Sequence, residues 1–429
     1  MRSYRSVALA SLSVAVFAAC SGDDSVLTPG SAPDASSDAP TADASMPHPD
    51  GAADAAQLDS AADSATADSA PDAGKTIVLS FAVVGCNRID PADYAAIDAS
   101  SQVPPSTANV EQLQRTFAEV AQLAPKPKYF FLAGDIIMGY VNNQSDAGVA
   151  TLDAQLSAWL ALYNASPLAS SGIAMIPIPG NHEVQSKIGS AKTAFLGAEQ
   201  VWLQKMASFI PSGFHRGPAA GATVLADSGA NPNALVTDQG RLTYSFDDGK
   251  THFVIVDTDP TGFDWNVPVD WIASDVAAAK TAGAKHVFAL GHKPAYAFAL
   301  NATDGLVAGF TRDAFWSTLE GAQAEAMIAA HNHVWWWSQP HAGKTFQVIA
   351  GNGGSRLEGT VLAADGGLPP NTGKYYGFTV VNVWSDDTVT IDSHGRDLPT
   401  GNYFDPAPAS MYPTTVRATV KATWGTTSQ

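Results

Sequence analysis

Four short stretches of this sequence combine metal-ligand side chains with a glycine or with the end of an apolar run. They are Gly134-Asp135, Gly180-Asn181-His182-Glu183, Gly291-His292 and His331-Asn332-His333. In a βα protein, ligands are placed at the carboxyl ends of the strands, where these stretches are expected to lie. Two divalent cations roughly 3.5–4 Å apart can clamp the attacking and leaving oxygens at phosphorus. The stretches therefore predict hydrolysis at phosphorus, with Asp135 as the carboxylate that both cations share.

The segments that must position these side chains alternate between strands and helices early in the chain and are mostly strands later. Strands are expected over residues 77–84, 129–133, 175–178, 242–246, 251–256, 286–290, 346–350, 378–383 and 388–392. Helices are expected over residues 110–123, 152–163, 200–209, 268–282 and 322–329, and a long loop over residues 213–239. This order favours an α/β fold, a four-layer α/β/β/α sandwich with two mixed β-sheets.

The motif set resembles that of the calcineurin-like metallophosphoesterases, a family related to the purple acid phosphatases. The resemblance runs from about residue 77 to residue 392, with the motifs in the family's order. It implies two divalent metal ions (zinc, manganese or iron) bridged by Asp135. The other ligands implied for one of the two sites are Asn181, His292 and His331, and His333 would belong to the other site. His182 would be the catalytic residue that stabilises the phosphoryl oxygens or protonates the leaving group.

The first motif departs from the family's Gly-Asp-x-His pattern and reads Gly85-Cys86-Asn87-Arg88. Cys86 as a thiolate ligand would favour a soft metal such as zinc. Alternatively, Asn87 or Asp90 is the ligand, or the site that includes His333 is vacant. Cys86 as a small buried packing residue is the competing structural interpretation. Arg88 is a candidate for binding substrate phosphate.

Three other segments have both a structural and a functional interpretation. The residues Trp335, Trp336 and Trp337 either pack in the core or wall the cleft against an aromatic substrate. The Gly-rich segment 351–356 is either a tight turn or a set of N–H groups that approach phosphate. Tyr140 lies further from Asp135 than the ligand tyrosine of the purple acid phosphatases does, so no ligand role is expected for it.

The N-terminus predicts export and lipid attachment. Arg2 and Arg5 precede an apolar run over residues 7–19, an order typical of a secretory signal. The run ends at Cys20 and resembles a bacterial lipoprotein cleavage box, so residues 1–20 are expected to be a lipoprotein signal peptide with Cys20 lipidated. An ordinary secretory signal cleaved nearby is the alternative. Residues 21–74 contain eleven Asp and no Lys, Arg or aromatic residue, which predicts a disordered tether before a metallophosphoesterase domain over residues 75–429.

The 429 residues carry a net charge of −18, so no nucleic-acid partner is expected, because binding one rests on neutralising phosphates. We expect an enzyme, a phosphoric ester hydrolase that acts on phosphomonoesters or phosphodiesters. Its expected location is the cell envelope, lipid-anchored to a membrane on the periplasmic or outer-membrane side of a Gram-negative bacterium. The alternative is a catalytically impaired binding or interaction module with the same fold, because the first motif is altered.

Overall fold

The computed structural model describes residues 74–89, 110–225, 233–298, 305–307, 310–357, 370–397 and 413–426. The predicted signal, Cys20, almost all of the predicted tether and Asp90 lie outside these residues. The chain from Lys75 onward forms one compact unit. Within the described ranges, no helix combines the length and the apolar character needed to cross a membrane.

The first large sheet has six strands in the order β18-β17-β16-β1-β2-β3. Their bounds are β1 (Ile77–Val84), β2 (Tyr129–Ala133), β3 (Ala174–Ile178), β16 (Tyr376–Trp384), β17 (Val389–Arg396) and β18 (Thr415–Lys421). Strands β1, β2 and β3 run parallel, whereas β16, β17 and β18 join antiparallel beside β1. The continuous apolar runs of β1 and β2 follow from their central position, because a strand covered on both faces has no polar side to present.

The second large sheet has eight strands in the order β15-β13-β14-β12-β11-β10-β9-β6. Their bounds are β6 (His215–Arg216), β9 (Tyr244–Asp248), β10 (Thr251–Val256), β11 (His286–Gly291), β12 (Ala326–Ala329), β13 (Trp335–Ser338), β14 (Phe346–Ala350) and β15 (Thr372–Gly373). Strands β10, β11, β12 and β14 are parallel. Two small hairpins pair β4 (Gln185–Ile188) with β5 (Ala191–Ala194) and β7 (Thr223–Leu225) with β8 (Asn233–Ala234).

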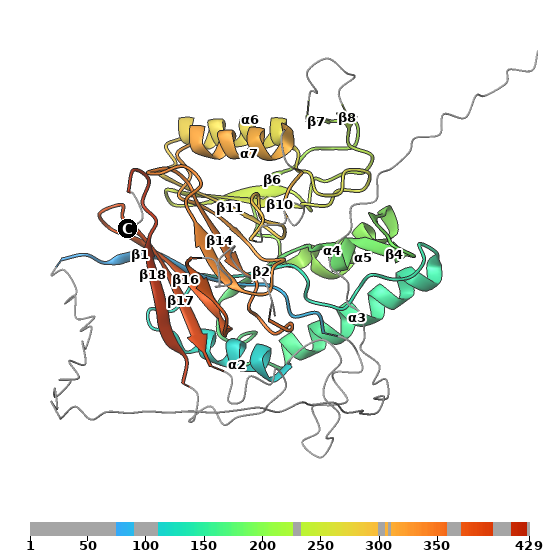
Figure 1. Cartoon of the computed structure of the whole chain (residues 1–429), viewed down its shortest axis with the longest axis horizontal. Helices are drawn as coiled ribbons and strands as arrows, with labels where there is room; N and C mark the ends of the chain where they lie inside the picture. The colour runs from blue at the N-terminus through green and yellow to red at the C-terminus, as the bar shows by residue number, and fades with distance from the viewer. Residues whose placement is uncertain are drawn as a thin grey trace, which may run out of the picture. The chain divides into compact units, whose positions relative to one another are not determined.

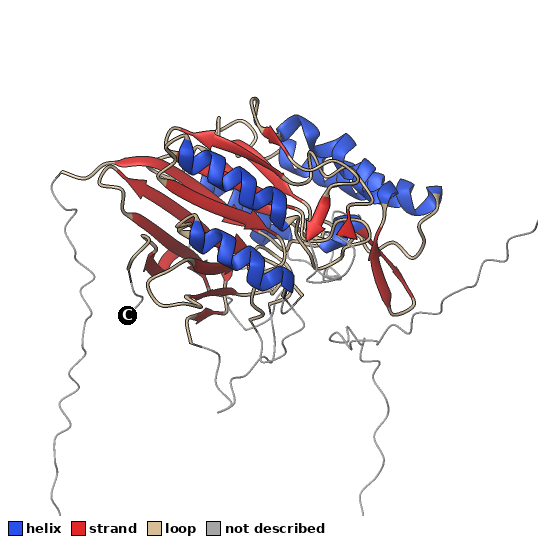
Figure 2. Cartoon of the chain, turned by 90° about the horizontal axis from the view of Figure 1, so that it is seen from above, coloured by secondary structure: helices blue, strands red, loops and turns tan. Residues whose placement is uncertain are grey.

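Helices cover the outer face of each sheet, so the predicted four-layer sandwich is confirmed (Figure 1). The first sheet is covered by α2 (Val110–Ala121), α3 (Asp146–Asn164) and α5 (Leu196–Met206), which continues into the 3-10 helix η1 (Ala207–Phe209). The second is covered by α6 (Val269–Thr281) and α7 (Phe310–Gly321), which lie side by side over its strands (Figure 2). The short helix α4 (Asn181–Val184) follows β3.

Aromatic rings fill the space between the two sheets. The ring of Phe81 on β1 lies 5.4 Å from that of Phe131, 5.2 Å from that of Phe253 and 5.1 Å from that of Phe288, all in edge-to-face contact. Such pairs add roughly 0.5–1.5 kcal/mol each beyond the area that they bury. This core fixes the sheets against each other and therefore fixes the relative positions of their strand ends.

The predicted helix over residues 322–329 is wrong. The helix α7 ends at Gly321, and Ala326–Ala329 forms the buried strand β12 between β11 and β14. The alanine-rich sequence favours a helix locally, but pairing with two neighbouring parallel strands overrides that propensity. The predicted loop over residues 213–239 also differs, since it contains the short strands β6, β7 and β8.

Candidate metal centre

The residues of the predicted site follow the ends of strands from both sheets. Cys86, Asp135 and Asn181 come after β1, β2 and β3, and His292 and His331 come after β11 and β12. Six of the nine non-glycine residues with positive φ in the described chain belong to this region: Cys86, Arg88, Asp135, Tyr140, Trp265 and His331. Such backbone conformations cost on the order of 1–3 kcal/mol each and cluster at functional sites, where the surrounding structure enforces them.

Four donor atoms converge at these strand ends. Oδ1 of Asp135 lies 3.0 Å from Nε2 of His292, which in turn lies 3.2 Å from Nδ1 of His331. The same nitrogen of His331 lies 3.0 Å from Oδ1 of Asn181. Ligand atoms bound at about 2.0–2.1 Å from one ion are themselves roughly 3 Å apart. The spacing and the chemistry of these donors therefore fit one divalent metal ion.

Backbone carbonyls fix the orientation of three of the histidines. The Nδ1–H of His292 donates to Ala133 O at 2.7 Å, and that of His333 donates to Arg356 O at 2.8 Å. His182 makes the same kind of bond to Met138 O. A hydrogen bond of this type sets the tautomer and leaves the Nε2 lone pair for a metal ion or a proton. The rings are thus held with Nε2 as the functional atom before any ligand binds.

The second carboxylate oxygen of Asp135 faces a cation and an imidazole. Oδ2 lies 3.4 Å from Nε of Arg88 and 3.8 Å from Nε2 of His182. Burial alone would raise the pKa of Asp135, but His182, His292 and Arg88 hold that pKa well below its usual range. Burial, followed by the charge of Arg88, lowers the pKa of His182 well below its usual value. Asp135 is therefore an ionised carboxylate, as a bridging ligand requires.

The altered first motif lies beside these donors. Sγ of Cys86, a carboxylate oxygen of Asp135 and a ring nitrogen of His292 all lie within 4.8 Å of one another. Burial, and then the charge of Asp135, raises the pKa of the Cys86 thiol well above its ordinary value. The thiol is therefore protonated unless a metal ion displaces the proton.

Asn87 has the environment expected of a ligand. Its side chain is fully buried, and neither its Oδ1 nor its Nδ2 has a hydrogen-bond partner. A buried amide without partners is rare and costs free energy, and a metal ion coordinated by Oδ1 would satisfy its oxygen. The structure thus brings Cys86, Asn87 and His333 to the region of Asp135, which keeps both candidate ligands of the first motif open.

The Gly-rich segment 351–356 supports the first motif. The N–H of Gly353 donates to Gly85 O at 3.1 Å, and the N–H of Ser355 donates to Cys86 O at 2.8 Å. These two N–H groups are consequently committed to the backbone and do not face a phosphate. The segment is a structural turn that also supplies the Arg356 carbonyl to His333.

The tryptophans after the last motif pack structurally, as the core interpretation expects. Trp335 is buried between the sheets and donates Nε1–H to Thr379 Oγ1 at 3.2 Å. Trp337 packs against Phe346 with their ring centroids 6.0 Å apart. Trp336 donates Nε1–H to Pro370 O at 3.0 Å.

Glu183 has a structural role that the sequence did not reveal, although it stands in the Gly-Asn-His-Glu motif. Its Oε2 accepts the N–H of Asp135 at 2.9 Å and that of Gly180 at 2.7 Å. Its Oε1 accepts the N–H of Ile136 at 2.8 Å and that of Ile137 at 3.1 Å. Burial, and then the charge of Asp135, raises the pKa of Glu183 to about 7. Glu183 therefore ties the loop that carries Asp135 to the loop that carries Asn181.

Tyr140 reaches the site without being placed as a ligand. Nδ2 of Asn181 donates to the Tyr140 hydroxyl, which turns Oδ1 of Asn181 toward His331. The Tyr140 ring also packs on His182, with their centroids 3.9 Å apart. Tyr140 and Asn181 are far apart in the sequence, so the sequence did not predict this contact.

A buried ion pair adjoins the donors on the side of the second sheet. The ammonium group of Lys293, which follows His292 directly, pairs with Asp259, and both side chains are fully buried. The same ammonium group lies 3.1 Å from the centroid of the Trp265 ring. Trp265 in turn makes an edge-to-face contact with His331 at 5.3 Å. No motif in the sequence marks Asp259 or Trp265.

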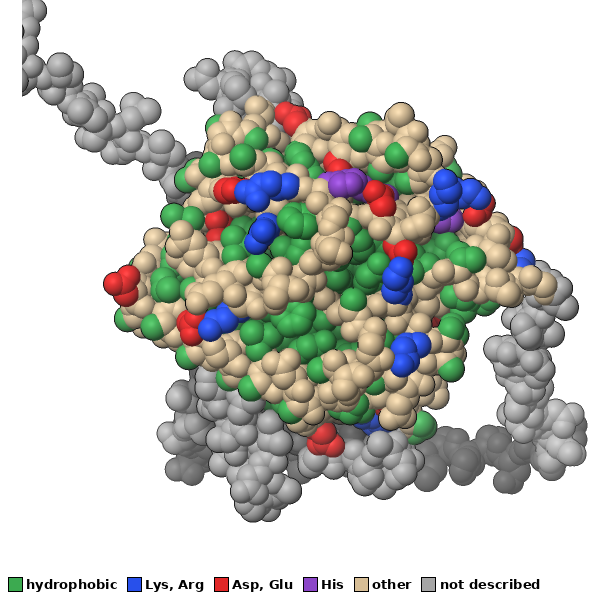
Figure 3. Space-filling model, turned by 180° about the vertical axis from the view of Figure 1, so that it is seen from behind, with side chains coloured by type: hydrophobic (Ala, Val, Ile, Leu, Met, Phe, Trp, Pro, Cys, Tyr) green, Lys and Arg blue, Asp and Glu red, His purple; other side chains and the backbone are tan. Residues whose placement is uncertain are grey.

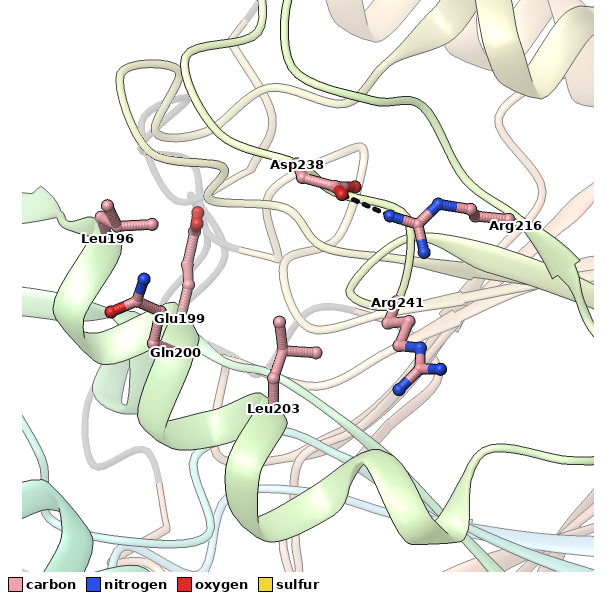
Figure 4. Close-up of a pocket in the computed structure, with 7 residues that line it drawn as sticks. All are labelled: Leu196, Glu199, Gln200, Leu203, Arg216, Asp238 and Arg241. Atoms are coloured by element: carbon pink, nitrogen blue, oxygen red, sulfur yellow. Dashed lines mark hydrogen bonds and ion pairs between the residues drawn. The ribbon is translucent and has the colours of Figure 1, made fainter.

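A separate surface pocket of about 200 Å³ contains none of the predicted site residues (Figure 4). It is lined by Leu196, Glu199, Gln200, Leu203, Arg216, Asp238 and Arg241, and Arg216 and Asp238 form an ion pair within it. On the face shown in Figure 3, Lys and Arg side chains are spread among apolar and uncharged ones rather than gathered in one patch. The convergent donors at the strand ends, and not this pocket, therefore define the candidate site.

Comparison with known proteins identifies the family. The sequence pattern of the family described as calcineurin-like phosphoesterase matches residues 90–335, which is more than half of the 429 residues. The chain belongs to the calcineurin-like phosphoesterase family. This assignment confirms the predicted family and agrees with the predicted enzyme class, and it implies divalent metal ions. The altered first motif precedes the matched residues.

Solved structures with similar folds have low sequence identity to this phosphoesterase. A purple acid phosphatase, PPD1, from yellow lupin (Lupinus luteus) seeds is 15% identical, with 74% of this chain and 51% of that chain covered and a TM-score of 0.49. This chain thus spans about half the length of that phosphatase. GAP50, the anchor in the inner membrane complex of Plasmodium, is 11% identical, with 81% of this chain and 90% of that chain covered and a TM-score of 0.42. A putative 5'-nucleotidase from Staphylococcus aureus is 10% identical, with 73% of this chain and 53% of that chain covered and a TM-score of 0.37. No curated protein sequence matches the chain.

Proposed function

We propose that this chain hydrolyses phosphomonoesters or phosphodiesters with two divalent metal ions that share Asp135. The observation that carries the proposal is the convergence of Asp135 Oδ1, His292 Nε2, His331 Nδ1 and Asn181 Oδ1 at separations of 3.0 to 3.2 Å. Metal ions bound there would supply Lewis acidity and an activated water for attack at phosphorus.

The chain's own residues hold the substrate and move the proton. Arg88 places a permanent positive charge beside Asp135 and keeps part of its side chain exposed, which suits it to a phosphoryl oxygen. His182 is anchored through Nδ1, so its Nε2 is the atom that would carry a proton to the leaving oxygen or bond to a phosphoryl oxygen. The ionised Asp135 offers Oδ1 to one side of the site and Oδ2 to the other.

The second metal site in this proposal uses His333 together with Cys86, Asn87 or both. The support is the fixed ring of His333, the unpartnered buried amide of Asn87 and the proximity of Cys86 to Asp135. A thiolate ligand would favour zinc, whereas an amide oxygen would suit harder metals such as manganese.

The decisive experiment counts metal ions and measures turnover on the same purified protein. Two ions per chain, with hydrolysis of a chromogenic phosphate ester that His292→Ala abolishes, are expected. The protein should be loaded separately with zinc, manganese and iron, because a protein that lacks its required metal ion would otherwise be mistaken for an inactive one. Absence of hydrolysis with every metal would contradict the proposal.

The second candidate is a binding module with the same fold. It is favoured by the first motif, where the protonated Cys86 thiol and the Arg88 guanidinium stand in place of an acidic and a histidine ligand. Under this proposal the protein binds one metal ion or none and gives no turnover. The metal count therefore separates the two candidates directly.

We also propose that the protein is exported and lipid-anchored through Cys20, on the cell envelope of a Gram-negative bacterium. The support is the charged and apolar N-terminus that ends at Cys20, followed by the acidic segment 21–74. More than one acyl chain would give stable anchoring. Cys20→Ala is expected to shift the protein from the membrane fraction to the soluble fraction, and a variant that stays with the membrane would contradict lipidation at Cys20.

A further inference from the structure

We propose that Trp265 is a specificity-determining residue that stacks on the leaving group, so that the preferred substrates are phosphate esters of aromatic alcohols. This inference rests on the proposed phosphoesterase function and adds the chemical class of the leaving group. It arises from the position of Trp265 at the accessible side of the donors and from the buried ion pair that holds its ring.

Solvent exposure shows which side of the site is open. Asp135, Asn181, His182 and His292 are buried. The site side chains that keep partial exposure are Arg88, Tyr140, Trp265 and His331. Among the described site residues, these four side chains are therefore the ones that a substrate can reach from solvent, and Trp265 and Tyr140 are the aromatic ones among them.

The position of Trp265 is enforced by its backbone contacts. Its φ is 66°, a left-handed conformation that is a genuine outlier for a bulky residue. Its N–H donates to Asp259 Oδ1 at 3.1 Å, and its carbonyl accepts the N–H of Val307 at 3.0 Å. The loop thus retains a strained conformation whose direct effect is to present this indole beside His331.

The buried ion pair also holds the ring. The Lys293 ammonium group lies over the ring, 3.1 Å from its centroid, and is paired with Asp259. Gln185 Nε2 donates to Asp259 Oδ1 at 3.0 Å and so fixes the carboxylate. A buried ion pair is not in itself a strong stabilising element. Here it supplies a cation–π contact to the indole. Trp265 as a whole stays half-buried, so a ligand can reach it.

The ring lies at a suitable place for a leaving group. It meets His331 edge to face at 5.3 Å, so a group extending from phosphorus past His331 would lie along the indole. Tyr140 is less suitable, because its hydroxyl is committed to Asn181 and its ring already packs on His182. An aromatic group gains from stacking on a held indole, whereas a small alkyl group cannot.

The test measures equilibrium binding of phenylphosphonate and methylphosphonate to zinc-loaded protein by calorimetry. Trp265→Leu removes the aromatic ring, and Trp265→Phe keeps one. Trp271→Ala, which changes a half-buried tryptophan on α6, is the matched control. We expect Trp265→Leu to weaken phenylphosphonate binding by about three- to tenfold and to leave methylphosphonate binding unchanged. Trp265→Phe should restore most of the loss.

Turnover gives the second readout and separates this inference from the proposed function. The ratio of kcat/KM for phenyl phosphate to that for ethyl phosphate should fall in Trp265→Leu and remain unchanged in Trp271→Ala. An unchanged ratio with active enzyme, or equal losses for both phosphonates, overturns the role of Trp265 and leaves the phosphoesterase proposal standing. If the wild type binds neither phosphonate and hydrolyses no phosphate monoester or diester with zinc, manganese or iron, both proposals are wrong. Thermal unfolding shows whether Trp265→Leu is misfolded. If it is, the comparison of Trp265→Phe with the wild type decides. Complete loss of the preference for phenyl compounds in Trp265→Phe would then contradict stacking.

Discussion

Oδ1 of Asp135 lies 3.0 Å from Nε2 of His292, and both side chains are fully buried. Asp135 follows a strand of the first sheet and His292 follows a strand of the second. The contact therefore exists only when the two sheets are packed, and the aromatic core between them fixes the distance on which metal binding depends.

Removal of either imidazole ring from the four converging donors should abolish metal-dependent hydrolysis. We expect His292→Ala and His331→Ala each to lower kcat/KM at least about 100-fold, since even groups that merely support metal ligands contribute 10–100-fold. Metal content should fall in both variants, measured by atomic emission on purified protein. The exposed His341→Ala is the matched control. Near-wild-type turnover in either variant would refute the ligand assignment.

His182 should affect the rate more than the metal content. It is held through Nδ1 by Met138 O, and its Nε2 lies 3.8 Å from Asp135 Oδ2. His182→Ala is expected to lower kcat by on the order of 10²–10⁴-fold, the usual contribution of a general acid or base. Metal analysis of the same sample should show unchanged stoichiometry, and a collapse in metal content would make His182 a ligand instead.

Replacement of Cys86 should identify the ligand in the first motif. If the thiolate is a ligand, Cys86→Ala loses the second metal ion, and Cys86→Asp retains it with a preference for manganese over zinc. If Asn87 is the ligand, Asn87→Ala loses that ion and Cys86→Ala keeps it. We expect at least one of the two alanine variants to lose one ion, measured as the metal-to-protein ratio. Two ions retained in both would exclude the first motif from metal binding.

Glu183 should be essential for stability. Its two oxygens accept four backbone N–H groups, and each buried donor left without a partner costs about 1–3 kcal/mol. Glu183→Ala is therefore expected to lower the free energy of unfolding by more than about 3 kcal/mol, measured by urea denaturation. The exposed Glu111→Ala should change it by less than about 0.5 kcal/mol. If Glu183→Ala also lowers the free energy of unfolding by less than about 0.5 kcal/mol, water replaces the carboxylate.

The buried His252 should make stability depend on pH. Burial alone would lower its pKa, but hydrogen bonds to Asp275 at 3.0 Å and Asp247 at 2.8 Å raise the pKa above 6.5. A raised folded-state pKa gives stability that is fully present below the unfolded pKa and is lost as pH rises through the folded one. The difference in unfolding free energy between wild type and His252→Gln should thus be larger at about pH 5.5 than at about pH 8.5. An equal difference at both pH values would mean that the pKa of His252 is the same in the folded and the unfolded protein.

Several parts of the site could be read from the sequence because their signals are local. Strands β1, β2, β3 and β11 are apolar runs that end at glycines or ligand residues, and the order of Asp135, Asn181, His292 and His331 along the chain predicts the family. The charged, apolar and acidic pattern of the N-terminus is also local, so its prediction needed no structure.

The tertiary structure decided what depends on contacts between distant residues. Residues 326–329 form a strand because β11 and β14 pair with them, against their local preference for a helix. Tyr140 meets Asn181 and Trp265 meets His331 only because loops from separate strands close over the same donors. The physical reason is that a sequence motif records which side chains can bind a metal ion, whereas the packing of two sheets determines which other side chains surround it and what they can recognise.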